Sequence, residues 1–156
     1  MAGTSGERRA GDTLSYALPA GVLAVELWRG DREGAWQFGR SFVATMAAAE
    51  ILKHTTGVER PDHSNDLSFP SSHAARAFAA ATYMHRRHGL DAALPLYALA
   101  TYVGYTRVRS GRHRWGDVAG AAALSAASSW LLVEKAPLTV SLAHGHIQAQ
   151  WSMPLR

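Results

Sequence analysis

Two histidines stand in surroundings that suit chemistry on an anionic group. His73 follows Pro70-Ser71-Ser72 at the predicted start of an alanine-rich helix. The unpaired backbone N–H groups of such a helix start form a ready seat for an anion. His113 precedes Asp117 by four residues, so one helical turn places the carboxylate beside the imidazole. A carboxylate on one ring nitrogen fixes the tautomer and leaves the other nitrogen free to attack.

Basic side chains are spaced so that they could meet at the same anion. Lys53 ends a predicted helix, and Arg60 lies in the following loop, where Pro61 restricts its backbone. Arg107 opens a basic run that continues with Arg109, Arg112 and Arg114. The chain has 16 Lys and Arg against 12 Asp and Glu, a net charge of +4 that indicates an anionic partner. Phosphate, nucleic acid and a lipid headgroup all satisfy this charge.

The elements that must position these residues are helices. Abundant alanine and few β-branched residues favour an all-α fold, and the apolar pattern predicts a bundle of about five helices. They cover about 12–28, 33–54, 72–89, 91–108 and 115–135. The last is rich in small residues on every side, which predicts that it lies at the centre of the bundle.

Three regions divide the chain of 156 residues. Residues 1–11 are predicted to be a disordered lead-in, with Asp12 or Thr13 capping the first helix. Residues 12–137 form the helical domain. Residues 138–156 alternate apolar and polar side chains, which predicts an extended tail beside the bundle, with a short hairpin turning at His144-Gly145.

The sequence contains no convincing membrane span, metal site or thiol chemistry. Its longest uncharged stretches are residues 118–133 and 92–106, which fall short of the roughly 20 residues a spanning helix needs. No signal sequence is evident, since Asp12 interrupts the apolar run after the first arginines. No tight ligand spacing joins the polar residues of the long loop, namely His54, Asp62, His63 and Asp66, and there are no cysteines.

The order of three motifs resembles a known family. The chain contains, in this order, Lys-x6-Arg-Pro, Pro-Ser-Ser-His and Arg-x5-His-x3-Asp. This order resembles the type 2 phosphatidic acid phosphatase superfamily, which includes bacterial acid phosphatases and vanadium haloperoxidases. The resemblance covers residues 53–117 and extends into the helix that follows. It implies an all-helical bundle with its site at one end. It also implies metal-independent hydrolysis of phosphate monoesters or pyrophosphates through a phosphohistidine.

The resemblance implies a role for each matching residue. His113 is the expected nucleophile, Asp117 its orienting partner, and His73 the general acid for the leaving oxygen. The expected phosphate-binding residues are Lys53, Arg60, Arg107, Ser71 and Ser72. Ser72 stands where the family usually has glycine, so it fits only if its φ is negative or the strain is tolerated. Thr106 replaces the usual serine and keeps the hydroxyl.

The resemblance also implies partners. A phosphorylated lipid, an isoprenoid phosphate or a small phosphoester is the expected substrate, with no cofactor, and vanadate is expected to inhibit. The expected location is the cell envelope, either in the periplasm or at a membrane surface. Nucleic acid is not an expected partner. The oligomeric state stays open.

Other functions remain to be separated from this one. A vanadate-dependent haloperoxidase would use the same cradle, and a non-catalytic protein could bind anions or nucleic acid through its arginine run. A family member that had lost activity through Ser72 is a further alternative. A catalytic cradle predicts abrupt loss at His113, His73 or Arg107 and little effect at Arg112 or Arg114. A binding patch predicts gradual loss along the run, with a steep salt dependence.

Overall fold

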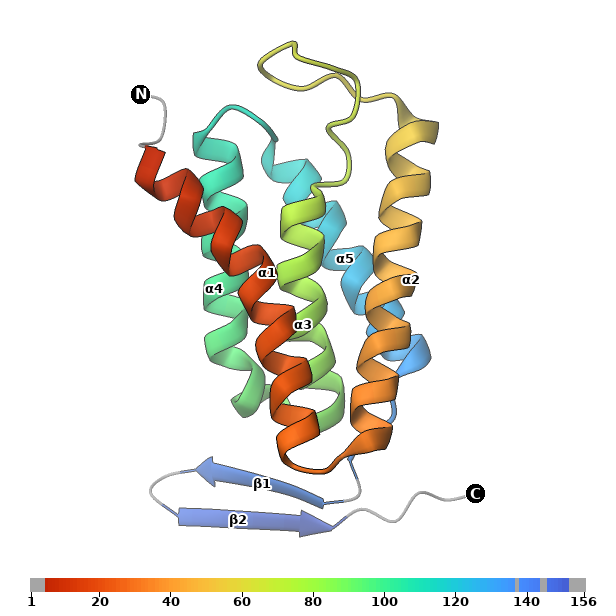
Figure 1. Cartoon of the computed structure of the whole chain (residues 1–156), viewed down its shortest axis with the longest axis vertical. Helices are drawn as coiled ribbons and strands as arrows, with labels where there is room; N and C mark the ends of the chain where they lie inside the picture. Colours follow the sequence, from red (N-terminus) through yellow and green to blue (C-terminus); the bar gives the residue numbers. More distant parts are fainter. Residues whose placement is uncertain (1–4, 137, 144–145, 152–156) are drawn as a thin grey trace.

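The chain folds into a helical bundle followed by a two-stranded hairpin (Figure 1). The computed structural model describes residues 5–136, 138–143 and 146–151. Its helices are α1 Ser5–Trp28, α2 Arg32–Thr56, α3 Ser72–His88, α4 Leu90–Arg109 and α5 Trp115–Leu132, and its strands are β1 Leu138–Ala143 and β2 His146–Trp151. The predicted all-α bundle of about five helices is therefore confirmed.

Helix α3 lies at the centre of the bundle, and the other four helices pack around it (Figure 1). Its alanines are buried almost without exception, and such small side chains let neighbouring backbones approach closely. The prediction that α5 is central is wrong, because Trp130 and Leu131 of α5 are 48% and 82% exposed. A small residue of α5 serves a local close contact instead, since a Cβ on Gly120 would lie 2.2 Å from Phe69 Cε2.

Helix α1 begins earlier than the sequence predicts. It starts at Ser5, so the predicted disordered lead-in is wrong from Ser5 onward, and residues 1–4 lie outside the described residues. Asp12 is inside the helix rather than at its cap. A Cβ on Gly11 would lie 2.1 Å from Thr106 Oγ1 and 2.8 Å from Arg107 Nη2. A glycine at this position therefore lets the first turns of α1 pack directly on α4.

Two polar residues fix the ends of the helices that carry the site. Asp31 caps α2 by accepting a hydrogen bond from Gly34 N at 2.8 Å. Ser71 caps α3 in the same way, with its hydroxyl 3.5 Å from Ala74 N. Gly57 ends α2 with a φ of 56°, a left-handed conformation that glycine adopts without a Cβ penalty. The loop 57–71 between these caps therefore starts and stops at defined points.

The hairpin lies across the end of the bundle away from that loop (Figure 1). Its strands pair antiparallel, with Leu138 opposite Trp151 and Ala143 opposite His146. The predicted turn at His144-Gly145 falls between the strands and lies outside the described residues. Within the described ranges, no helix combines the length and the apolar character that crossing a membrane requires.

Candidate active site

A cavity of about 520 Å³ lies at the end of the bundle where α1 and α3 begin and where α2 and α4 end. Its lining consists of Ser5, Arg8, Arg9, Asp12, Lys53, Arg60, Ser72, His73, Arg107, Arg112 and His113. Segments far apart in the sequence reach this end together (Figure 1). The two imidazoles and three predicted basic side chains therefore border one cavity, which is the spatial convergence that the motif order requires.

His113 and Asp117 are both buried at the start of α5. The His113 Nδ1 atom lies 3.5 Å from Asp117 Oδ2, a distance for an ion pair but too long for a good hydrogen bond. The same carboxylate oxygen accepts hydrogen bonds from Ser68 Oγ at 2.6 Å and from Arg114 N at 2.8 Å. Asp117 is thus held rigidly beside the ring. Ser68, which the sequence motifs did not identify, is its buried support.

The surroundings of His113 favour its neutral form. Burial lowers the pKa of His113 to about 4, and the positive charges of Arg60 and Lys53 act in the same direction. The Asp117 carboxylate and the Ser68 backbone oppose this shift of the pKa without cancelling it. A neutral imidazole with a carboxylate beside Nδ1 keeps Nε2 available as a nucleophile.

His73 lies at the first turn of α3 and meets a carboxylate from α1. Its Nε2 atom is 3.1 Å from Asp12 Oδ1. Burial lowers the pKa of His73 to about 4, helped by the guanidinium groups of Arg107 and Arg76, while Asp12 raises it. His73 is therefore neutral near pH 7. A phosphate dianion bound beside it would raise its pKa again.

Lys53 and the start of α3 are joined directly. Lys53 Nζ donates a hydrogen bond to Ser72 Oγ, and burial lowers the pKa of this lysine, with Arg60 adding to the shift and Glu50 opposing it. Among the described residues His63 is the one non-glycine residue with a positive φ, so Ser72 fits the position of the family's glycine without strain.

Ser71 lies behind the cavity rather than on its lining. Its side chain is fully buried and accepts the hydrogen bond from Ala74 N, and its own N–H donates to Asp117 O at 3.2 Å. This position does not favour the predicted contact between Ser71 and phosphate. It instead ties the start of α3 to the start of α5, and so it helps to set the spacing of the two imidazoles.

The arginines of residues 107–114 point in different directions. Arg107 Nη1 binds Asp12 Oδ1 at 2.7 Å, and Arg112 lines the cavity with its Nε 3.4 Å from Asp62 Oδ2. Arg114 Nη1 donates instead to Glu59 O at 2.7 Å, and Arg109 lies over the Tyr105 ring. These residues do not form one continuous basic face. The turn at Gly111 brings Arg112 to the cavity lining, and the small effect expected of a change at Arg112 stays a prediction.

Helix α1 supplies four lining residues that the motifs did not predict. They are Ser5, Arg8, Arg9 and Asp12. Arg107 is bound to this helix twice, through Asp12 and through Arg8 O, which accepts from Nη2 at 2.9 Å. The sequence signal was a single carboxylate that interrupts an apolar run, one turn after paired arginines. Taken alone, that pattern also fits an ordinary helix start.

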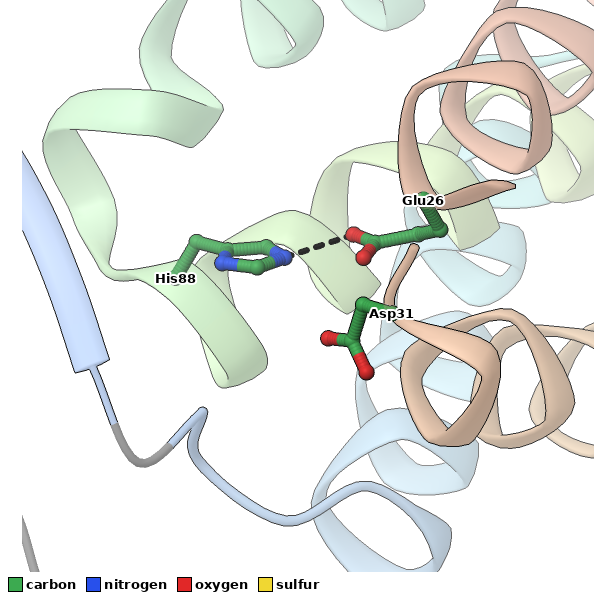
Figure 2. Close-up of side chains that lie close together, drawn as sticks. All are labelled: Glu26, Asp31 and His88. Carbon is green, nitrogen blue, oxygen red and sulfur yellow. Dashed lines mark hydrogen bonds and ion pairs between the residues drawn. The ribbon is translucent and has the colours of Figure 1, made fainter. Parts of the chain in front are cut away.

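A second buried cluster lies at the opposite end of the bundle. Figure 2 shows Glu26, Asp31 and His88 from three segments close together, with the His88 ring pointing toward the Glu26 carboxylate. Their potential ligand atoms all lie within 4.8 Å of one another. In the described part of the chain, this is the one group of such side chains close enough together to hold a metal ion. Both Asp31 oxygens are already used, by Gly34 N and by Arg87, and His88 Nε2 lies 2.6 Å from Glu26 Oε1. We interpret the cluster as two polar pairs, Arg87 with Asp31 and His88 with Glu26.

The long-loop residues with metal-ligand chemistry do not converge. His63 Nδ1 lies 2.7 Å from Glu59 Oε1 on the surface, and His54 Nε2 lies 3.1 Å from Glu50 Oε1. Asp62 instead accepts hydrogen bonds from Ser64 within the loop and faces Arg112. These contacts make the loop a set of local polar pairs that borders the cavity.

Comparison with known proteins establishes the family. The PAP2 superfamily model matches residues 34–138, and the chain belongs to the PAP2 superfamily. This confirms the family that the three motifs predict. The crystal structure of LpxE from Aquifex aeolicus has the same fold, with a TM-score of 0.68, 21% identity, and coverage of 85% of this chain and 88% of that one.

Curated relatives of the chain are named as phosphatases. The Helicobacter pylori lipid A 4'-phosphatase is 32% identical over 114 residues, which cover 66% of this chain and 57% of the relative. The Porphyromonas gingivalis lipid A 1-phosphatase is 36% identical over 127 residues, 72% of this chain and 28% of the relative. The Mycobacterium tuberculosis decaprenylphosphoryl-5-phosphoribose phosphatase is 37% identical over 122 residues, 72% of this chain and 67% of the relative. The chain thus spans little more than half of the first relative and under a third of the second.

Proposed function

We propose that this protein is a phosphatase that hydrolyses a phosphate monoester or pyrophosphate of a lipid or isoprenoid through a phosphohistidine on His113. The observation that carries the proposal is the shared cavity, in which two neutral imidazoles face a set of basic side chains. Phosphoryl transfer needs positioning and positive charge more than covalent machinery, and this cavity offers both. The names of the relatives, which include lipid A and decaprenyl phosphatases, support the substrate class.

In the first step the phosphoryl group moves to His113. Asp117 lies beside Nδ1, so the Nε2 lone pair attacks phosphorus and a P–N bond forms. The P–O bond to the substrate breaks as the new bond forms, and the leaving oxygen takes its electron pair. Lys53, Arg60 and Arg107 stabilise the negative charge on the remaining phosphoryl oxygens.

His73 completes both halves of the reaction. Neutral His73 takes the proton that a substrate monoanion brings and donates it to the departing oxygen, which leaves as an alcohol or as a phosphate. The neutral ring then accepts a proton from a water molecule, which attacks the phosphohistidine and breaks the P–N bond. Inorganic phosphate forms, His113 regains its lone pair, and His73 is protonated again.

The proposed chemistry uses no metal ion, since basic side chains take the place of a cation at the phosphoryl oxygens. Vanadate, which imitates the five-coordinate transition state, is expected to inhibit. Exposed apolar side chains stand near the cavity end of the bundle, including Ile51, Tyr105 and Trp115. They give the acyl or prenyl part of a substrate a surface to rest on, and they fit an enzyme that works at the cell envelope.

The test is phosphate release from a panel of phosphorylated lipids and soluble esters, measured with EDTA present. We expect the native protein to release phosphate and His113→Ala to release none above background. His54→Ala serves as the matched control, because His54 is exposed on α2 and pairs only with Glu50. Activity that EDTA abolishes would overturn the metal-independent mechanism. Bromide peroxidation with added vanadate, without any phosphate release, would show a haloperoxidase instead.

A further inference from the structure

The cavity holds more positive charge than one phosphoryl group requires. Of the 16 Lys and Arg residues in the chain, six line it, whereas one of the 12 Asp and Glu residues does so. A phosphate monoester carries about two negative charges near pH 7, and Lys53, Arg60 and Arg107 suffice to hold it. Three arginines from outside the family motifs, Arg8, Arg9 and Arg112, are left over.

These extra arginines differ in their partners. Arg112 has Asp62 as a counter-ion at 3.4 Å. Arg8 and Arg9 make no side-chain hydrogen bond or ion pair within residues 5–136, although both border the cavity. Both residues are exposed, so water screens part of the repulsion between their neighbouring charges, and a bound anion would offset the rest. Their position at the cavity therefore suits an anionic ligand.

The geometry of α1 places that ligand next to the phosphoryl seat. Arg8 precedes Asp12 by four residues, about one turn or roughly 6 Å along the helix. Asp12 lies at the proposed phosphoryl-binding site, because its Oδ1 atom contacts both Arg107 and His73. A cavity of about 520 Å³ also has room for more than one phosphate. The separation suits two phosphate groups of one head group.

We propose that Arg8 and Arg9 form a subsite for a second phosphate group, so that the preferred substrate carries two phosphates close together. The inference rests on the proposed phosphatase function and specifies its substrate class. The second phosphate could be the inner group of a diphosphate or a separate ester on the same head group. Either phosphate group would present negatively charged oxygen atoms to Arg8 and Arg9.

The test compares three substrates with one decyl chain: decyl phosphate, decyl diphosphate and a vicinal decanediol bisphosphate. We would measure kcat and KM at constant ionic strength for the native protein and for Arg8→Gln with Arg9→Gln. The control is Arg29→Gln with Arg32→Gln, which removes the same charge from exposed positions at the other end of the bundle. We expect the first variant to raise KM about tenfold or more for the doubly phosphorylated substrates and less than about twofold for decyl phosphate.

Each outcome decides the question. A selective increase for the diphosphate alone, the bisphosphate alone, or both supports the subsite and identifies the source of the second phosphate. An equal increase for all three substrates would show general electrostatic attraction and overturn the inference, as would no increase for any. These failures leave the phosphatase function intact, because decyl phosphate would still be hydrolysed. Loss of the proposed function would instead appear as no hydrolysis by the native protein.

Discussion

Asp12 of α1 holds Arg107 of α4 through a contact of 2.7 Å between Oδ1 and Nη1. The same oxygen lies 3.1 Å from His73 Nε2, so one carboxylate bridges an arginine and a histidine of two family motifs. Both of those groups are proposed to contact the substrate phosphoryl group. Asp12 is therefore placed to compete with a phosphate oxygen for these two groups, and we expect substrate to displace it.

Replacement of Asp12 by Asn should tighten phosphate binding. The amide keeps the shape of the side chain and removes the negative charge that competes for Arg107 and repels the substrate. We expect Asp12→Asn to lower the inhibition constant of inorganic phosphate at least about threefold and to lower KM, with kcat retained. Product-inhibition kinetics on a soluble ester measure all three quantities.

The opposite role for Asp12 gives the opposite kinetics. If the carboxylate were needed to keep His73 protonated, Asp12→Asn would lower kcat strongly and leave phosphate inhibition unchanged or weaker. Asp91→Asn is the charge control, since Asp91 is exposed at the far end of α4. A gain in phosphate affinity in both variants would indicate a general charge effect rather than competition at the seat.

Gly11 should be as important as the residues that touch substrate, because it sets the position of α1. An alanine Cβ there would overlap Thr106 Oγ1, so α1 must move away from α4. We expect Gly11→Ala to lower the free energy of unfolding by about 1–3 kcal/mol and to raise KM for doubly phosphorylated substrates, since Arg8 and Arg9 move away from the cavity with α1. Urea unfolding and steady-state kinetics measure the two effects.

The same helix offers a matched control. A Cβ on Gly21 meets no atom within 4 Å, so Gly21→Ala should stabilise the protein by about 0.5–1 kcal/mol through helix propensity and leave KM unchanged. Equal effects of the two substitutions would mean that the close packing of α1 on α4 does not position the site.

The motif residues could be predicted from the sequence because their spacing encodes their geometry. His113 and Asp117 are one helical turn apart, and Ser71 is a residue type that starts helices, so local rules place these groups correctly. Lys53 and Arg107 both end a helix, and short connections in a bundle bring such ends together. These relationships depend on neighbours in the sequence or on the order of motifs.

The contributions of α1 could not be predicted in this way. Asp12 meets Arg107 across 95 positions of the chain, and no local pattern sets that distance. The contact depends on Gly11, whose missing side chain becomes informative only once the helix beside it is known. The central helix was misplaced for a similar reason, since small residues occur both at a bundle centre and at a single close contact, such as that of Gly120 with Phe69.

Activity should have an acidic optimum, because the pKa of His113 and the pKa of His73 are each lowered to about 4. A lowered pKa favours the neutral ring, so His113 can attack at any pH above about 4 and loses its lone pair to a proton below it. Neutral His73 needs the proton that a substrate monoanion brings, and phosphate esters lose that proton near pH 6. We expect kcat/KM for decyl phosphate to be highest between about pH 4 and 6.

The pH profile has a built-in check. An ester whose second phosphate pKa is lower should move the alkaline limb to lower pH by the same amount and leave the acidic limb in place. Activity that keeps rising from pH 6 to 8 on decyl phosphate would contradict the neutral state of His73 in the empty cavity. Urea unfolding at each pH separates loss of activity from loss of structure.

The buried pair of Glu26 and His88 should stabilise the fold without taking part in catalysis. Glu26 is fully buried at the far end of the bundle, 2.6 Å from His88 Nε2, and its other carboxylate oxygen has no hydrogen-bond partner among the described residues (Figure 2). Removing one member strands the other in a medium of low polarity. We expect Glu26→Gln to lower the free energy of unfolding by about 3–5 kcal/mol, with kcat/KM unchanged well below the melting temperature.

A double variant distinguishes an ion pair from simple packing at this end. Glu26→Leu with His88→Leu removes both polar groups together and should destabilise the protein less than Glu26→Leu alone. Glu50→Gln is the exposed control, since its pairing with His54 is solvated and its loss should cost less than about 1 kcal/mol. Strictly additive costs in the double variant would show that the two side chains do not stabilise each other. A fall in kcat/KM without a change in stability would instead connect this cluster to the site.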